Sequence, residues 1–291
     1  MLIKTETAPQ TPEELYLDLL KKVLTRAVIA SDVERHTIAA LGPKSRLIHR
    51  FNRFAVRHNL EAVRLVKTTP EDYLESGHEA GHRMESAETM LGLRQLQHME
   101  NCIVDVLRSG IPGDLLEAGV WRGGMTIFMR GVLRAYGVSD RRVWVADSFE
   151  GLPEPEDGQE YVGWNEGDMA VPLERVRENF ERYGLLDDQV RFLPGFFSNT
   201  LPQAPIEKLA ILRVDADLHS STLDVLNNLY ARLSPGGYAI FDDYHNLPDC
   251  KRAIHEFRTA HGITEEIKSI DTRAVYWRRE ASNAAVLATT A

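Results

Sequence analysis

The stretch Leu115–Gly124, which reads L-L-E-A-G-V-W-R-G-G, contains residues whose types and spacing suit ligand binding. Two apolar residues lead into Glu117, and Gly119 and Gly123 follow it, which predicts the end of a strand and the start of a helix. Glycine is needed where a turn is tight or a ligand approaches the backbone, and a helix N-terminus offers free N–H groups. An acid inside this turn disfavours a phosphate ligand and favours a cationic or hydroxyl-rich one. S-adenosylmethionine (SAM), with its sulfonium, amino group and ribose, therefore fits better than a dinucleotide.

A second group of acids follows two further apolar runs. Asp215 comes directly after Leu209–Val214, and Asp242 and Asp243 come directly after Tyr238–Phe241. Because the carboxyl ends of parallel strands meet at one edge of a sheet, we expect these three acids to lie together. Oxygen-only ligands of this kind suit Mg²⁺.

The residues alone leave other interpretations of these acids open. The Asp242–Asp243 pair can instead cap the turn that follows it, as aspartates often do. Asp217 can replace Asp215, because one residue of register reverses the direction of a side chain. Asp147 ends another apolar run, 30 residues after Glu117, a little farther than the usual ribose-binding acid of a βαβ unit. Acids gathered at one edge repel each other and lose hydration, so we expect a positive group to compensate them.

The elements that carry these acids alternate between strand and helix patterns. Strands are expected at Leu115–Gly119, Arg142–Ala146, Val190–Leu193, Leu209–Val214, Tyr238–Phe241 and Ala274–Trp277. Helices are expected at about 125–136, 173–183, 223–233 and 250–261. This alternation predicts an α/β fold with a doubly wound, mostly parallel sheet. The α/β core is expected to span residues 111–280, between a helical N-terminal region, 1–110, and a disordered tail, 281–291.

Helix signals dominate the N-terminal region. Thr11–Glu14 combines an N-cap hydroxyl, a proline at the first helical position and an acid at the third. A long amphipathic helix is expected from Met90 to Leu107. The basic segment Arg46–Lys67 is expected to be an amphipathic helix with a solvated basic face; contact of that face with an anionic ligand or a partner subunit is the alternative. The apolar faces of these helices predict an interface between copies of the chain, in a dimer or larger homo-oligomer.

The segment His78–His82 matches the H-E-x-x-H pattern of zinc peptidases. Gly77 and Gly81 weaken the helix that such a site needs, by about 1 kcal/mol each relative to alanine. No third ligand follows at a familiar spacing. We therefore expect a mobile polar segment near a substrate pocket rather than a zinc site.

Composition limits the class of protein further. The 291 residues carry a net charge of −9, which predicts no general attraction to nucleic acid or to an anionic membrane. No apolar run reaches membrane-spanning length, and the N-terminus lacks the apolar core of a signal peptide. Cys102 and Cys250 are the two cysteines, so no disulfide framework is implied. These features predict a cytoplasmic protein.

Five motifs in this order resemble the macrocin O-methyltransferase (TylF/MycF) family. They are E-A-G-V-W-R-G-G (117–124), V-A-D-S-F-E-G-L-P-E-P (145–155), F-L-P-G-F-F-S-N-T-L-P (192–202), L-R-V-D-A-D-L-H-S-S-T (212–222) and G-G-Y-A-I-F-D-D-Y (236–244). The resemblance covers about residues 85–279. It implies a class I SAM methyltransferase with a seven-stranded, Rossmann-like sheet and a SAM- and Mg²⁺-dependent, oligomeric enzyme. The implied substrate is a small glycosylated natural product, such as a macrolide, methylated on a hydroxyl of a deoxysugar. The N-terminal region is then expected to help form a lid.

The resemblance also implies roles for individual residues. The implied SAM site comprises Glu117, Gly119, Val120, Arg122, Gly123, Asp147, Ser148, Gly195, Phe196 and Asp215. The implied metal ligands are Asp215, Asp242 and Asp243, and Asp215 is also the implied catalytic base. His219 and His245 are alternative bases, because the pKa of a histidine suits proton transfer near neutral pH. Arg122 is expected to pair with the carboxylate of SAM.

Two departures from the family pattern leave the acceptor open. Ala216 and His219 stand where one family motif usually has glycine and tyrosine, and Phe196 stands where another often has tryptophan. These changes alter the pocket rather than the acids. A catechol-type O-methyltransferase acting on a phenolic diol and a SAM-binding protein without catalysis are the alternatives.

Overall fold

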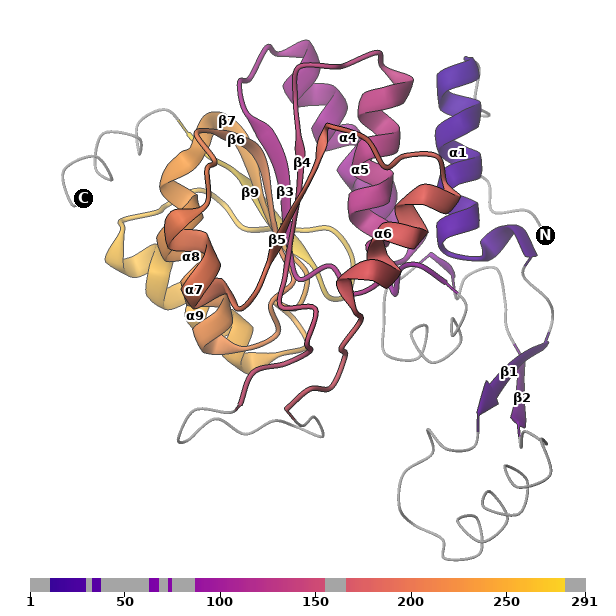
Figure 1. Ribbon diagram of the computed structural model, residues 1–291. Helices are drawn as coiled ribbons and strands as arrows, with labels where there is room; N and C mark the ends of the chain where they lie inside the picture. Colours follow the sequence, from indigo (N-terminus) through magenta and orange to yellow (C-terminus); the bar gives the residue numbers. More distant parts are fainter. Residues whose placement is uncertain are drawn as a thin grey trace, which may run out of the picture.

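A seven-stranded sheet forms the centre of the computed structural model, which describes residues 11–29, 33–37, 63–67, 73–74, 87–154 and 166–280. The strand order is β5-β4-β3-β6-β7-β9-β8 (Figure 1). The strands are β3 (Asp114–Ala118), β4 (Val143–Asp147), β5 (Val190–Pro194), β6 (Leu209–Val214), β7 (Leu233–Phe241), β8 (Lys268–Ser269) and β9 (Val275–Arg278). Strands β3 to β7 are parallel, whereas β9 runs antiparallel to β7 and β8 antiparallel to β9. The predicted mostly parallel, seven-stranded sheet is therefore confirmed.

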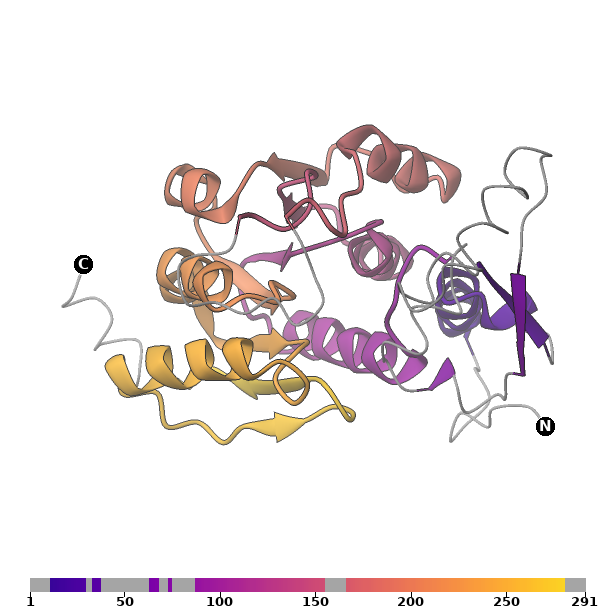
Figure 2. The same cartoon turned by 90° about the horizontal axis from the view of Figure 1, so that it is seen from below.

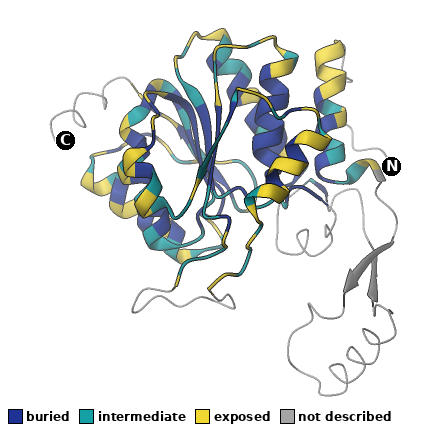
Figure 3. Cartoon of the chain, in the orientation of Figure 1, coloured by how far each residue is buried: buried dark blue, intermediate teal, exposed yellow. Residues whose placement is uncertain are grey.

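Helices cover both faces of this sheet, which explains why its central strands are almost continuously apolar. The helices are α1 (Pro12–Leu24), α4 (Leu93–Arg108), α5 (Gly124–Ala135), α6 (Leu173–Arg182), α7 (Phe197–Thr200), α8 (His219–Leu229) and α9 (Pro248–Ala260). Leu115 and Val143 face a hydrophobic cluster with α1, α4, α5 and α6, whereas Leu116 and Trp144 face a second cluster with α8 and α9. Figures 1 and 2 show these two helical layers, and Figure 3 shows the buried sheet between them. The fold is thus doubly wound.

Helix α1 begins as its sequence predicts. The Thr11 hydroxyl accepts from the Glu14 N–H at 3.2 Å, and the Glu14 carboxylate accepts from the Thr11 N–H at 3.3 Å. This reciprocal capping box satisfies two backbone donors that the helix itself leaves unpaired. Leu17, Leu20 and Leu24 then pack against α5 in the first cluster.

The N-terminal region is not helical throughout. Val33–Thr37 (β1) and Val63–Lys67 (β2) pair as an antiparallel two-stranded sheet. The helix predicted over Arg46–Lys67 is therefore wrong at its C-terminal end, because V-R-L-V-K finds a partner strand 30 residues away in the sequence. The rest of that segment, His78–His82 and the tail 281–291 lie outside the described residues.

Strand β7 begins earlier than the predicted strand Tyr238–Phe241, because it also includes Leu233–Gly237. The pairing of β7 with β6 shifts register here: Leu209 pairs with Leu233, and the next pair is Ile211 with Tyr238. The extra residues form an irregular stretch at the start of the strand.

Helices α1 and α4 share one hydrophobic cluster with the sheet and α5, although both precede residue 110. The domain boundary at residue 110 stays a prediction. In the part of the chain that the structure describes, no helix is both long and apolar enough to span a membrane.

Candidate active site

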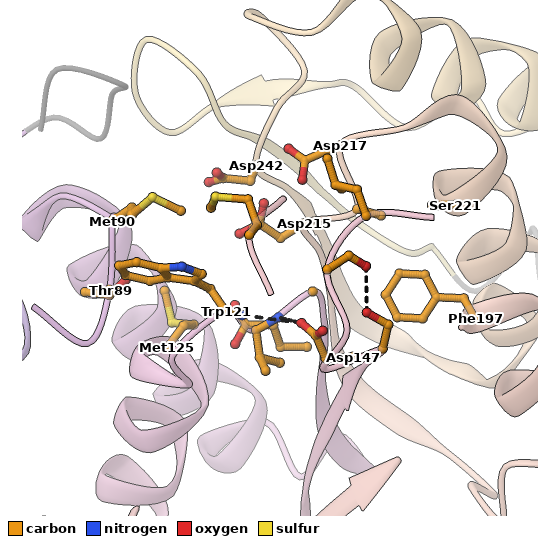
Figure 4. Close-up of a pocket in the computed structure, with 18 of the residues that line it drawn as sticks. Thr89, Met90, Trp121, Met125, Asp147, Phe197, Asp215, Asp217, Ser221 and Asp242 are labelled. Carbon is orange, nitrogen blue, oxygen red and sulfur yellow. Dashed lines mark hydrogen bonds between the residues drawn. The ribbon is translucent and has the colours of Figure 1, made fainter. Parts of the chain in front are cut away.

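A cavity of about 470 Å³ opens beyond the carboxyl ends of β3, β4, β6 and β7 (Figure 4). This is the edge of the sheet at which ligands of doubly wound folds bind. The predicted site residues that line it are Glu117, Gly119, Val120, Asp147, Ser148, Phe196, Asp215 and Asp242.

The turn after β3 requires glycine because two strand ends meet there. Gly119 has φ +86, and a Cβ at this position would overlap the carbonyl oxygen of Asp215. The Asp215 N–H in turn donates to the carbonyl of Ala118 at 2.8 Å. Gly123, with φ +85, is the N-cap of α5. Gly119 therefore brings the first turn directly against the end of β6, where the acid cluster begins.

Asp147, the last residue of β4, organises the loop after β3. Its carboxylate accepts from the N–H groups of Val120 at 2.7 Å and Phe149 at 2.8 Å. Burial raises the pKa of Asp147 despite these hydrogen bonds. The neighbouring Ser148 hydroxyl donates to the carbonyl of Gly151 at 2.7 Å. Both side chains thus hold the loops that border the cavity beside β4.

Glu117 is a buried acid with one unsatisfied oxygen. Its Oε1 accepts from Arg213 Nη1 at 2.5 Å, and its Oε2 has no hydrogen-bond partner among the described residues. Burial raises the pKa of Glu117 to about 7, although Arg213 opposes the shift. An acceptor of this kind on a cavity wall is suited to a ligand that donates hydrogen bonds.

Asp215, Asp242 and Asp243 come together as the sequence predicts. Each offers a carboxylate oxygen, and these oxygens lie within 4.8 Å of one another. Burial, followed by repulsion from Asp242, raises the pKa of Asp215 well above its usual value. Asp217, the alternative to Asp215, also lines the cavity, and burial and the nearby Asp243 raise its pKa too.

Arg213, in β6, is the positive group that the acids require. Its side chain is fully buried and donates to Glu117, to Asp215 at 2.9 Å and to Asp242 at 2.9 Å. Burial by itself lowers the pKa of Arg213, but the three carboxylates raise it overall. One guanidinium therefore links the turn after β3 to the acids of β6 and β7.

Arg273, before β9, compensates the far side of the cluster. It donates to Asp243 Oδ1 at 2.6 Å and lies 3.9 Å from Asp242 Oδ2. Its carbonyl accepts from the His245 N–H at 3.0 Å, so the loop after β7 is held by backbone and side chain together. Burial favours the neutral form of Asp243, but Arg273 and Asn246 hold its pKa below the usual value.

The three acids fit a divalent cation. Arginine holds one oxygen of each: Asp215 Oδ2, Asp242 Oδ1 and Asp243 Oδ1. The second oxygen of Asp243 is buried and makes no hydrogen bond to any residue that the structure describes. An all-carboxylate donor set of this kind matches Mg²⁺.

The opposite wall of the cavity is apolar. Trp121 lies beside Thr89, Met90 and Met125 in Figure 4, across the cavity from Phe197. Trp121 adopts φ +48, a conformation that bulky residues rarely take. The site thus combines one acidic side with one side of thioether and aromatic groups.

Several predicted residues do not line the cavity. The Arg122 guanidinium donates to the carbonyl of Ala87 at 2.9 Å and stacks 4.2 Å from the Trp121 ring. His219 contacts Glu256, and His245 contacts Ser269. Gly123, Gly195, Asp243 and the two histidines are likewise absent from the lining. Of the three alternative bases, only Asp215 lines the cavity, and Arg122 contacts Ala87 and Trp121 instead.

Residues that the sequence analysis missed complete the site. The cavity is also lined by Thr89, Met90, Leu91, Trp121, Met125, Gly151, Leu152, Pro153, Met169, Phe197, Ser221 and Arg273. Arg213 could have been predicted to belong to the site, because a charged residue within an apolar strand covered on both faces requires buried partners.

The fold and the cavity at this edge of the sheet define a class I SAM-dependent methyltransferase. A sequence profile of the macrocin O-methyltransferase (TylF) family matches residues 13–279. The chain therefore belongs to this family and is an O-methyltransferase.

Three similar proteins support this assignment. Mycinamicin III 3″-O-methyltransferase of Micromonospora griseorubida is 44% identical over 94% of this chain and 100% of its own length. The 8-demethyl-8-(2,3-dimethoxy-alpha-L-rhamnosyl)-tetracenomycin-C 4′-O-methyltransferase of Streptomyces olivaceus is 54% identical over 68% of this chain and 78% of its own length. The solved structure of the O-methyltransferase NovP has a TM-score of 0.75 and 41% identity, covering 92% of this chain and 99% of that one.

Proposed function

We propose that this enzyme transfers the methyl group of SAM to a hydroxyl of a deoxysugar on a glycosylated natural product, and that the reaction depends on Mg²⁺. The observation that carries the proposal is the convergence of Asp215, Asp242 and Asp243 beside the cofactor cavity. Arg213 and Arg273 compensate part of the negative charge of these acids, and Mg²⁺ would compensate the rest.

Related enzymes support a sugar as the acceptor. One of them is named for transfer to the 4′ oxygen of a rhamnosyl-tetracenomycin, and another for transfer to the 3″ oxygen of mycinamicin III. Each of these matches covers two thirds or more of the present chain.

We assign Mg²⁺ and SAM to different groups of residues in the cavity. Asp215, Asp242 and Asp243 would hold Mg²⁺, which supplies Lewis acidity when bound. Glu117, with its unsatisfied Oε2, and the loops organised by Asp147 would hold SAM, which supplies the methyl group.

Asp215 is the group that we assign to accept the proton of the acceptor hydroxyl. Asp215 lines the cavity, and Arg213 holds its Oδ2 in place. Trp121 and Met125 exclude water from the opposite wall.

A chelation experiment tests the metal. SAM binding is measured by calorimetry and methyl transfer by mass spectrometry, each with chelator and after Mg²⁺ is restored. We expect transfer to vanish with chelator and to return with Mg²⁺. We expect Asp242→Asn to abolish Mg²⁺-dependent turnover and to leave SAM binding nearly intact, whereas Asp188→Asn, at an exposed acid away from the cavity, changes neither. An active Asp242→Asn enzyme that chelator does not inhibit would disprove the metal proposal.

An acceptor panel tests the substrate class. It contains a rhamnosylated polyketide, the matching aglycone and a catechol. Transfer to the glycoside alone supports the proposal, and transfer to the catechol alone replaces it with a phenolic acceptor.

We also propose that the enzyme is a homo-oligomer. Leu15 and Leu19 on α1 are 56% and 53% exposed, and Val28 nearby is 49% exposed. Burial of such side chains against a second copy removes apolar surface from water. Sedimentation at several concentrations tests this, and a monomer at every concentration would contradict it.

A further inference from the structure

Gln95 is a buried amide within the apolar stripe of α4. It lies in the first turn of the helix, is 3% exposed, and precedes the core residue Leu96. Its Oε1 accepts from Arg213 Nη2 at 3.2 Å, and its Nε2 donates to Asp271 Oδ2 at 3.2 Å. A helix in the layer beside the sheet thus reaches the groups that hold the acids.

This amide connects the two arginines of the site. Arg213 holds the acids at the ends of β6 and β7. Asp271 holds the other arginine, because its Oδ1 accepts from the backbone N–H groups of Arg273 at 2.9 Å and Ala274 at 2.8 Å. Gln95 is therefore bonded directly to Arg213 and, through Asp271, to the backbone of Arg273.

The chemistry of an amide suits this position. An amide both donates and accepts hydrogen bonds and adds no charge to a site that already contains many. Gln95 also makes a side-chain hydrogen bond with Asp242, one of the acids proposed to hold the cation.

We propose that Gln95 is a positioning residue of the metal site, which makes α4 part of that site. By fixing Arg213 and the loop that carries Arg273, it keeps one oxygen of each carboxylate available to the cation. This inference rests on the proposed Mg²⁺ dependence. It goes beyond that dependence because it gives a residue before the predicted domain boundary a role in metal affinity.

The test is a binding measurement on the full-length enzyme without SAM and without acceptor. Mn²⁺ affinity is measured by electron paramagnetic resonance, SAM affinity by calorimetry, and Tm by circular dichroism. Gln95→Met keeps the length of the side chain but removes its hydrogen bonds. Gln97→Met is the matched control, because that glutamine lies on the same helix and bonds Lys21 and Asn101.

We expect Gln95→Met to raise the Kd for Mn²⁺ about 10–100-fold, the usual effect of losing a partner of a metal ligand. The Kd for SAM should stay within about threefold of the unmodified enzyme, and Gln97→Met should change neither constant. Where Gln95→Met does not fold, Gln95→Asn carries the same expectation, because its shorter amide cannot reach both partners.

Three outcomes would overturn the inference in distinguishable ways. Unchanged Mn²⁺ affinity in the Gln95 variant removes the positioning role and leaves the proposed function standing. Equal losses of SAM and Mn²⁺ affinity with a lower Tm indicate a merely structural role. Failure of the unmodified enzyme to bind Mn²⁺ removes the proposed metal and the inference together.

Discussion

Replacing Arg213 with methionine removes a fully buried cation that three carboxylates share at 2.5–2.9 Å. The side chains of Glu117 and Asp242 are only 3% and 4% exposed, so water cannot replace the lost partner. Breaking a buried ion pair from one side costs about 3–5 kcal/mol of the free energy of unfolding. With an unfolding entropy of about 2.1 cal/mol/K per residue, a chain of 291 residues loses about 5–8 °C in Tm.

Thermal unfolding followed by circular dichroism between pH 5 and pH 8 measures this effect. Without Arg213, the pKa values of the acids rise further above their unfolded values. An acid whose pKa is raised on folding destabilises the folded state increasingly as the pH rises, because ionisation is then more costly in the folded protein than in the unfolded one. The loss of Tm caused by Arg213→Met should therefore be largest at pH 8. Arg130→Met is the control, because its partner Asp187 is 36% exposed and regains water. Two results would refute the reasoning. One is a Tm of Arg213→Met within about 2 °C of the unmodified enzyme at pH 8, and the other is a loss of Tm that is larger at pH 5 than at pH 8.

Three further substitutions test other contacts. Gly119→Ala should lower stability by about 1–3 kcal/mol from backbone strain alone and weaken SAM binding, since its Cβ displaces Asp215; calorimetry and melting curves check both. Burial raises the folded pKa of Glu117 to about 7, so this acid destabilises the fold progressively as the pH rises from about 4.5 to 7. The Tm of Glu117→Gln relative to the unmodified enzyme should therefore rise over that pH range. A difference in Tm that does not change with pH would contradict the raised pKa of Glu117. Arg130 lowers the pKa of Asp187, so Asp187→Asn should cost about 1 kcal/mol at pH 7, and the difference should disappear in acid as Asp187 itself is protonated below its usual pKa.

Local sequence patterns were sufficient for six of the seven strands of the main sheet and for the main acids, whereas the two-residue strand β8 was not predicted. Continuous apolar runs predicted the buried strands, and the acid after each run predicted the edge at which Asp147, Asp215 and Asp242 lie. The capping pattern at Thr11 likewise located the start of α1. These features depend on neighbours within a few residues, which a single sequence displays.

The interactions that join the acids could not be predicted from local sequence patterns. Arg213 meets Glu117 across 96 residues and Gln95 across 118, and neither distance leaves a local pattern. Gln95 falls within a helical apolar stripe, where its amide resembles an interruption rather than a contact. The strand Val63–Lys67 was missed for the same reason, because its partner strand is distant in the sequence.

The backbone contact between Gly119 and Asp215 limits how this enzyme can be re-engineered. A side chain at Gly119 would overlap the Asp215 carbonyl, and Asp215 itself belongs to the acid cluster, so neither position can be varied to alter acceptor choice alone. Met90, Met169 and Phe197 line the cavity without belonging to that turn or to the acid cluster. A directed-evolution library for new acceptors should therefore vary these three positions and keep the two strand ends constant.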